Sequence, residues 1–259
     1  MKISIVMSYY NRKRQLYETL KSINKSKFRD FEVIIVDDCS FPEHRVEEFE
    51  TEFSFLNVVR INEKDKWYVN SCVPYNIGFR AVRGEIVVIQ NPECIHVQDV
   101  LTHINEYIDE NTYISISAYA VNHEITKNLP SYFESETIGE YFKTLPQRPT
   151  GGSPIIGWYN HSKYRPTGFH FCSAITKNNL DLLNGFDERY AYGIAYDDNE
   201  FLERVRRLGL KVVIPDNVSV IHQYHDSVYY NLPDMGYLHE KNKRLFNEIT
   251  KIEKTYRAN

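Results

Sequence analysis

Polar and charged side chains that could hold a ligand or move a proton are grouped at five places in the chain. Four groups follow predicted strands, and the fifth opens a predicted helix. Ligands of open α/β sheets bind beyond the carboxyl ends of the strands, so we expect these segments to meet in one cleft. The segments are Ser8-Tyr9-Tyr10-Asn11, Asp37-Asp38-Cys39-Ser40, Gln90-Asn91-Pro92-Glu93, Asp197-Asp198-Asn199-Glu200 and His222-Gln223-Tyr224-His225-Asp226.

Glu93 and two histidines are candidate metal ligands. Magnesium and manganese accept one or two carboxylates together with phosphate oxygens, and imidazole suits a transition-type ion. His222 and His225 lie three positions apart after a strand, which makes a metal site as plausible an interpretation as a structural role. The alternatives are a tight turn at Asn91-Pro92-Glu93 and histidines with a purely structural role.

Asp198 is a candidate general base. On a helical wheel it lies on the apolar side, while the pairs Glu200–Arg204 and Glu203–Arg207 are expected on a solvated face. A carboxylate at a helix N-terminus is favoured in its anionic form. Such a group can take the proton of an attacking hydroxyl. The alternative is a helix cap.

The first two polar segments could bind a nucleotide. Small polar and aromatic groups such as Ser8 and Tyr10 can hydrogen-bond and stack on a base, and a carboxylate such as Asp38 can accept from a base imide or a ribose hydroxyl. The alternatives are a helix cap at Asn11 and a turn at Asp37-Asp38. Neither a G-x-G-x-x-G motif nor a Walker phosphate loop occurs, so the phosphates need another positive partner, and a metal ion is the natural candidate.

The elements that must position these groups alternate between strands and helices. Short β-rich runs and helical spacings follow one another, as expected for a mostly parallel sheet with right-handed crossovers. The predicted strands are 3–7, 33–36, 56–61, 86–89, 113–117 and 211–214. The predicted helices are 12–23, 75–82 and 97–108, two that start near 176 and 197, and a polar one over 236–256.

The middle segment, 118–166, differs from the rest of the chain. It carries five prolines and the pair Gly151-Gly152. We expect it to be irregular and to supply loops that contact substrate.

Composition narrows the class of protein. The chain has 259 residues, 25% of them charged, and a formal net charge of -4, which argues against nucleic-acid binding. None of the four cysteines forms a C-x-x-C pair, so a zinc site is not expected. A reducing compartment is the simpler inference from these cysteines. No run approaches the roughly 20 apolar residues of a membrane span, and no signal peptide is evident. We therefore expect a cytoplasmic protein without a transmembrane segment.

Several of these segments together resemble the inverting family 2 glycosyltransferases of GT-A fold. The resemblance covers about 1–120 and 173–225, and its Asp-Asp-Asn-Glu segment is similar to the Glu-Asp-Asn-Glu form of chondroitin-type polymerases and β-1,4-galactosyltransferases. The segments that carry it are Ile5-Val6-Met7-Ser8-Tyr9-Tyr10-Asn11-Arg12, the run 31–40, Tyr75-Asn76-Ile77-Gly78-Phe79, Asn184-Gly185-Phe186-Asp187-Glu188 and Tyr196-Asp197-Asp198-Asn199-Glu200-Phe201.

The resemblance implies one α/β domain over 1–259, with a Rossmann-like, mostly parallel sheet flanked by helices and a small antiparallel part toward the C-terminal half. Its donor half would span about 1–97 and its acceptor half about 98–228. A helical tail would span about 229–259.

The resemblance also implies roles for individual residues. Glu93 and His222 would bind Mn²⁺ or Mg²⁺, with His225 as the alternative ligand, and Asp198 would be the general base. Trp158 would stack on an acceptor sugar, unless it is a buried anchor. The donor, most often a uridine nucleotide, would contact Ser8, Tyr10, Asp38, Asn76, Gln90 and Asn91, and the acceptor would also contact Asp197 and Asn199.

The chain departs from the family pattern at two places. Asn91-Pro92-Glu93 stands at the D-x-D position, so one carboxylate remains. Pro74-Tyr75 replaces the usual Ala-Arg, and Arg80 or Arg83 is the candidate substitute for that arginine.

The predicted activity is a single displacement that moves a sugar from a nucleotide diphosphate to a saccharide or glycoconjugate hydroxyl, with inversion. The alternatives are a degenerate domain that binds nucleotide or sugar without catalysis and a sugar nucleotidyltransferase. The latter needs a glycine- and arginine-rich loop after the first strand, which the chain lacks.

Overall fold

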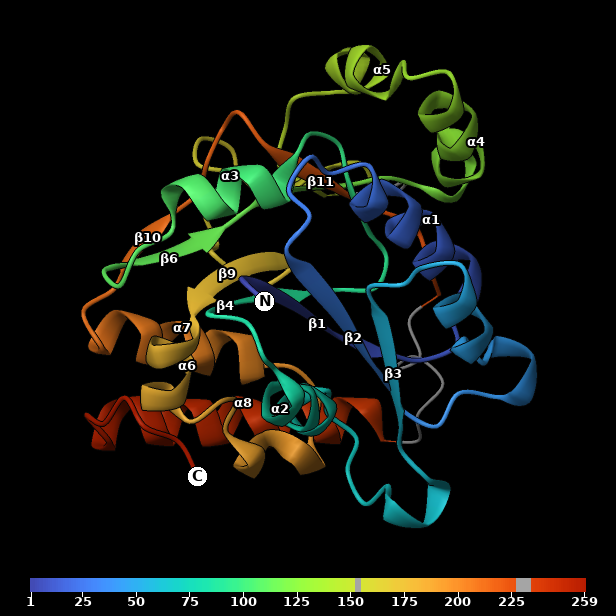
Figure 1. Cartoon of the computed structure of the whole chain (residues 1–259). Coiled ribbons are helices and arrows are strands. Elements are labelled where there is room, and N and C mark those ends of the chain that lie inside the picture. Colours follow the sequence, from blue (N-terminus) through green and yellow to red (C-terminus); the bar gives the residue numbers. More distant parts are fainter. Residues whose placement is uncertain (152–154, 227–233) are drawn as a thin grey trace.

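The computed structural model describes residues 1–151, 155–226 and 234–259, which fold around a seven-stranded sheet (Figure 1). Its order is β10-β6-β9-β4-β1-β2-β3. β1 pairs in parallel with both β2 and β4, and β9 runs antiparallel between β4 and β6. The strands are β1 Ile3–Tyr9, β2 Phe31–Asp37, β3 Leu56–Arg60, β4 Ile86–Gln90, β6 Thr112–Ser115, β9 Cys172–Thr176 and β10 Lys211–Val213. The predicted mostly parallel α/β sheet with an antiparallel part is confirmed.

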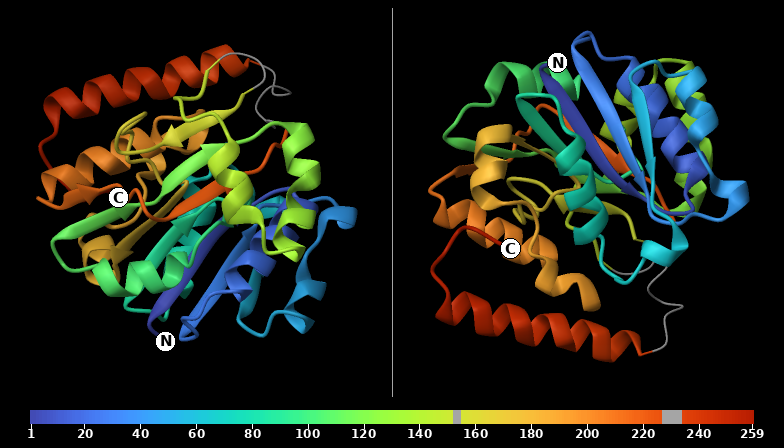
Figure 2. Two further views of the ribbon diagram at one scale, coloured as in Figure 1. Left: turned by 90° about the horizontal axis from the view of Figure 1, so that it is seen from above. Right: turned by 60° about the horizontal axis from the view of Figure 1, so that its bottom comes forward.

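Helices cover both faces of this sheet because its central strands are apolar on both sides. Every residue of β2 is buried, as expected for a strand enclosed between two helical layers. One face packs against α1 Lys13–Asn24 and α3 Val100–Tyr107. The other packs against α2 Cys72–Ala81, α6 Lys177–Leu183, α7 Asp197–Arg207 and α8 Met235–Ile252. Figure 2 shows α8 along an outer edge of the molecule.

A second, four-stranded sheet has the order β5-β11-β7-β8. Its strands are β5 Cys94–His96, β7 Ser117–Ala120, β8 Gly157–Asn160 and β11 Ser219–His222. The predicted strand 113–117 is in fact two strands, β6 and β7, which belong to different sheets. The chain therefore passes from the main sheet into the smaller one at Ile116.

The segment 118–166 is more regular than predicted. It forms α4 His123–Glu134 and α5 Ile138–Thr144, which stand apart from the main sheet in Figure 1. Asn122 caps α4 by accepting from the Ile125 N–H, and Pro130 lies inside that helix. Leu129, Phe133 and Phe142 bury these helices against the smaller sheet. The prediction of an irregular segment from its prolines was wrong here, because the packing of this core outweighs the cost of one proline inside a helix.

Short 3₁₀ turns complete the described structure. They are η1 Pro42–His44, η2 Glu47–Thr51, η3 Glu63–Asp65 and η4 Glu188–Tyr192. None of the helices in the described ranges is long and apolar enough to cross a membrane.

Candidate active site

A cleft of about 800 Å³ opens at the carboxyl ends of the central strands. It gathers segments that lie far apart in the chain, from the ends of β1, β2 and β4, the loop after β3, the start of α7 and the segment after β11. Eight residues singled out in the sequence as nucleotide, metal, proton-transfer or acceptor groups line it, together with the alternative ligand His225. The eight are Ser8, Tyr10, Asp38, Asn91, Glu93, Asp197, Asp198 and His222.

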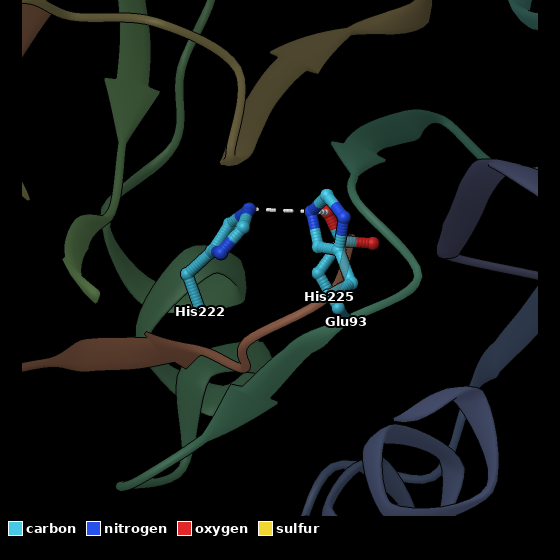
Figure 3. Close-up of side chains that lie close together, drawn as sticks. All are labelled: Glu93, His222 and His225. Carbon is cyan, nitrogen blue, oxygen red and sulfur yellow. Dashed lines mark ion pairs between the residues drawn. The ribbon is translucent and has the colours of Figure 1, made fainter. Parts of the chain in front are cut away.

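Glu93, His222 and His225 form a compact cluster on one side of the cleft (Figure 3). The Oε1 atom of Glu93 lies 3.0 Å from His222 Nε2 and 3.3 Å from His225 Nε2. The three candidate ligand atoms lie within 4.8 Å of one another, and the Glu93 side chain is only 1% exposed. One carboxylate and two imidazoles at this spacing suit a divalent transition-type cation.

Strand pairing builds this cluster. β11 pairs antiparallel with β5, and His222 lies opposite Cys94, next to Glu93. The Gln223 N–H donates to the Glu93 carbonyl (3.1 Å), which fixes the chain just beyond the strand. The candidate ligands were identified from the sequence. The two short strands β5 and β11 were not predicted, and neither was their pairing.

Arg12 is a member of the cluster that sequence reasoning missed. Its Nη1 donates to the Oε2 atom of Glu93 at 2.8 Å, so the two carboxylate oxygens face different partners. Burial alone would raise the pKa of Glu93, but the nearby charges of Arg12 and His225 and hydrogen bonds from His222 and His225 hold it well below its usual range. Glu93 is therefore ionised at neutral pH.

Asp197 and Asp198 lie at the N-terminus of α7, on the cleft. Asn70 Nδ2 donates to Asp197 Oδ1 (3.0 Å), and the Asn199 N–H donates to Asp198 Oδ1 (2.8 Å). Burial and the neighbouring charge of Asp197 raise the pKa of Asp198 to about 7. A carboxyl group with that pKa can exchange a proton near neutral pH.

Further along α7, the prediction that the charged pairs lie on a solvent-exposed face is partly wrong. Glu200 and Arg204 pair as predicted, at 2.6 Å, but both side chains are only 3% exposed. Arg204 also donates to the carbonyls of Leu183 and Gly185, so it connects α7 to the end of α6. The Arg204 side chain is buried because these backbone acceptors lie inside the fold.

Asp38 anchors a second polar cluster at another part of the cleft. Lys66 Nζ lies 2.8 Å from Asp38 Oδ2, and the Tyr68 hydroxyl donates to Asp38 Oδ1 at 2.7 Å. Lys66 also lies over the Tyr10 ring, 5.0 Å from its centroid. Burial raises the pKa of Asp38, although Lys66 and Tyr68 oppose the shift.

The adjacent Asp37 has different partners and a different environment. It is fully buried, pairs with Arg60 at 2.9 Å and accepts from the Ser40 N–H at 2.9 Å. The two neighbouring acids are thus divided between the interior, where Asp37 ends β2, and the cleft, which Asp38 lines just beyond the strand.

Four predicted site residues are not among the described residues that line the cleft. Asn76 bonds to both backbone groups of Phe186, and Gln90 bonds to Cys94 and His96 in the interior. Asn199 is half-buried in the first turn of α7. None of these three belongs to the described lining of the cleft, and their contacts with donor or acceptor stay predictions.

Trp158, the fourth of these residues, is an anchor of the smaller sheet. Its side chain packs against Tyr119 and Phe142 and is only 4% exposed. The buried alternative thus describes its position better than the sugar-stacking one.

The predicted substitutes for the missing arginine also lie elsewhere. The guanidinium of Arg83 donates to Glu32 at 2.8 Å, near the start of β2 and away from the carboxyl ends of the strands. Arg80 is exposed and does not belong to the described lining. Lys66, which no sequence motif singled out, is the cation beside Asp38.

Comparisons with known proteins agree with this geometry. Residues 4–165 match the family described as Glycosyl transferase family 2. An uncharacterized glycosyltransferase of Haemophilus influenzae is 26% identical over 60% of this chain and 51% of its own length. The amylovoran biosynthesis glycosyltransferase AmsB of Erwinia amylovora is 25% identical over 82% of this chain and 66% of its own. The chain thus spans between half and two thirds of the length of these curated relatives.

Solved structures share the fold. S. aureus TarS 1-349 in complex with UDP superposes with a TM-score of 0.59 at 17% identity, covering 98% of this chain and 73% of that one. GalNAc-T7 with UDP, GalNAc and Mn²⁺ gives a TM-score of 0.66 at 15% identity, covering 96% of this chain and 48% of that one. At these identities the likeness concerns the GT-A fold alone. The family match over residues 4–165 covers more than half of the chain, which shows that the chain belongs to glycosyltransferase family 2.

Proposed function

We propose that the chain transfers a sugar from a UDP-sugar to a hydroxyl of a saccharide or glycoconjugate, with inversion at the anomeric carbon and with the help of a divalent cation. The observation that carries the proposal is the meeting, in one cleft, of a carboxylate–histidine cluster and an aspartate pair without a cationic partner among the described residues.

The Asp38 cluster would bind the base of the nucleotide. A uracil imide presents one N–H between two carbonyl groups. The Asp38 carboxylate can accept that hydrogen, and the Lys66 ammonium can donate to a neighbouring carbonyl. Tyr10 provides a ring beside this pair for stacking. Ser8 also lines the cleft and would bond to the ribose or the base.

Glu93, His222 and His225 would hold Mn²⁺ or Mg²⁺. The donor set fits such an ion because a buried, ionised carboxylate and two imidazoles converge within ligand distance of one another. The bound ion would neutralise the charge that develops on the departing diphosphate. Arg12 holds the second oxygen of Glu93 and keeps the first directed at the histidines.

Asp198 would act as the general base. Its carboxylate takes the proton of the acceptor hydroxyl as that oxygen forms a bond to the anomeric carbon. The bond from the anomeric carbon to the diphosphate breaks in the same step, and the diphosphate leaves with the electron pair. One displacement of this kind inverts the anomeric centre. Asp197 and Asn199 would contact the acceptor.

A screen of nucleotide-sugar hydrolysis with and without Mn²⁺ tests the proposal, because water can replace an unidentified acceptor. We expect slow hydrolysis of at least one UDP-sugar that depends on the metal. UDP binding with complete inertness toward every donor would instead support the alternative of a binding domain without catalysis.

A further inference from the structure

Trp67 and Tyr192 form an exposed aromatic corner beside the cleft. Their ring centroids lie 5.2 Å apart with the planes tilted by 51°. Trp67 is 50% exposed and Tyr192 is 53% exposed, whereas the chain's other tryptophan, Trp158, is almost fully buried. Large aromatic side chains that stay in water next to a polar cleft are typical of ligand-binding surfaces.

Two loops hold this corner in place. The N–H groups of Val69 and Asn70 both donate to the Ala191 carbonyl, at 2.8 and 3.1 Å, and join the loop after β3 to the end of η4. Trp67 also meets the cleft residue Tyr68 edge to face at 5.6 Å. The rings are thus held by backbone hydrogen bonds and by packing, so little order is lost when a ligand binds.

The corner is continuous with the part of the cleft that carries the aspartate pair. Beyond Tyr192 the chain continues through Ile194 and Ala195, which line the cleft, to Asp197 and Asp198. Lys241 of α8 lies 5.1 Å from the centre of the Tyr192 ring. The corner therefore combines the Trp67 ring with a Tyr192 ring that has the Lys241 ammonium over it, beside the residues that line the cleft.

We propose that this corner binds a sugar ring of the acceptor. A pyranose has an apolar C–H face that packs on an aromatic ring and hydroxyl groups at its edge that can accept from an ammonium. A free hydroxyl of the same saccharide would then extend toward Asp198. This assignment rests on the proposed function, since it takes the saccharide to be the acceptor.

Tryptophan fluorescence and calorimetry test the assignment on the whole chain. The probes are the β-linked tetrasaccharides of glucose, N-acetylglucosamine, galactose and mannose, each added in the presence of UDP and Mn²⁺. Only two tryptophans are present, and Trp158 is buried, so a change in emission that is absent from Trp67→Ala reports on Trp67. We expect at least one tetrasaccharide to shift the emission.

Variants separate the corner from the donor site. Trp67→Ala and Tyr192→Ala should each weaken saccharide binding at least about fivefold, and Trp67→Tyr should restore part of it by calorimetry. The matched control is Tyr107→Ala, which removes an equally exposed tyrosine from α3. UDP should bind Trp67→Ala with wild-type affinity.

Three results would overturn the assignment. They are the absence of saccharide binding to the wild-type chain, saccharide binding that survives both alanine substitutions, and a loss of UDP affinity in Trp67→Ala that matches the loss of saccharide affinity. Failure of the proposed function is a separate result, because it would appear as inertness of the wild-type chain toward every nucleotide-sugar.

Discussion

The two acidic centres of the cleft differ in how their charge is balanced. Glu93 is surrounded by Arg12, His222 and His225, and these neighbours lower its pKa. Asp198 has another carboxylate, Asp197, as its neighbour, and burial and that charge raise its pKa to about 7. One centre keeps a permanent negative charge, and the other is balanced between its two protonation states at neutral pH.

This difference in pKa matches two different functions, cation binding and proton acceptance. A group that binds a cation must stay ionised, while a group that accepts a proton works best with a pKa near the pH of the reaction. The arrangement at Glu93 comes from neighbours that are distant in sequence. The arrangement at Asp198 comes from burial within the fold and from the adjacent carboxylate of the same helix, so residue type alone does not reveal either. The contrast predicts that the same carboxylate-to-amide change will have different consequences at the two centres.

The largest effect is expected at Asp198. Asp198→Asn should lower the turnover number for sugar transfer by about a thousandfold, because an amide cannot take the acceptor proton. The affinity for UDP, measured by calorimetry, should stay near that of the wild type. The control is Glu203→Gln, a change of the same kind in the same helix. Unchanged turnover in Asp198→Asn would remove this residue from the role of base.

Removal of the carboxylate at the other centre should affect the metal first. Glu93→Gln is expected to weaken Mn²⁺ binding at least about a hundredfold, because the amide lacks the charge that a divalent cation requires. Titration of Mn²⁺ followed by electron paramagnetic resonance measures this loss. Glu85→Gln, at an exposed glutamate just before β4, is the control. Wild-type Mn²⁺ affinity in Glu93→Gln would place the ion elsewhere.

A smaller effect is expected at Arg12, which acts on the metal through Glu93. Arg12→Gln should weaken Mn²⁺ binding roughly tenfold or somewhat more, in the range typical of groups that orient a metal ligand. Arg12→Lys should recover part of the loss, since it keeps the charge but not the planar donor. If both variants bind Mn²⁺ like the wild type, the Arg12–Glu93 contact has no role in positioning.

The smallest effect is a displacement of a pH profile. A base must be deprotonated to act, so with Mn²⁺ saturating, kcat should fall about tenfold per unit as the pH drops below about 7. Asp197→Asn removes the charge that helps to raise the pKa of Asp198. The acid limb of the profile, where kcat falls with falling pH, should therefore move to lower pH. A limb that stays in place or moves upward would contradict the proposed coupling of the two carboxyl groups.

Much of the framework was predictable from local patterns. β-branched runs such as 33–36 and the apolar spacing of α1 gave the correct elements, because a strand or helix with a fully covered side must be continuously or periodically apolar. The two acids at the end of β2 were recognised because charge at the end of a buried strand is costly unless it is paired or faces a polar cleft. Glu93 was recognised because an oxygen ligand for a metal follows the end of β4.

The remainder depends on contacts between segments that are distant in the chain. Arg12 and Lys66 carry no local signal of their partners, Glu93 and Asp38. Glu200–Arg204 has the spacing of a surface pair, and only the position of α6 shows that it is buried. Trp67 and Trp158 look alike in sequence, yet packing buries one and leaves the other at the cleft. Tertiary arrangement decides each of these cases.

A crystal of the chain grown with UDP and Mn²⁺, with data collected at the manganese absorption edge, tests the central claim most directly. The account predicts an anomalous peak at coordination distance from Glu93 and the His222–His225 pair, with the diphosphate in the same cleft as Asp198. A manganese peak away from Glu93, or UDP bound outside this cleft, would contradict it.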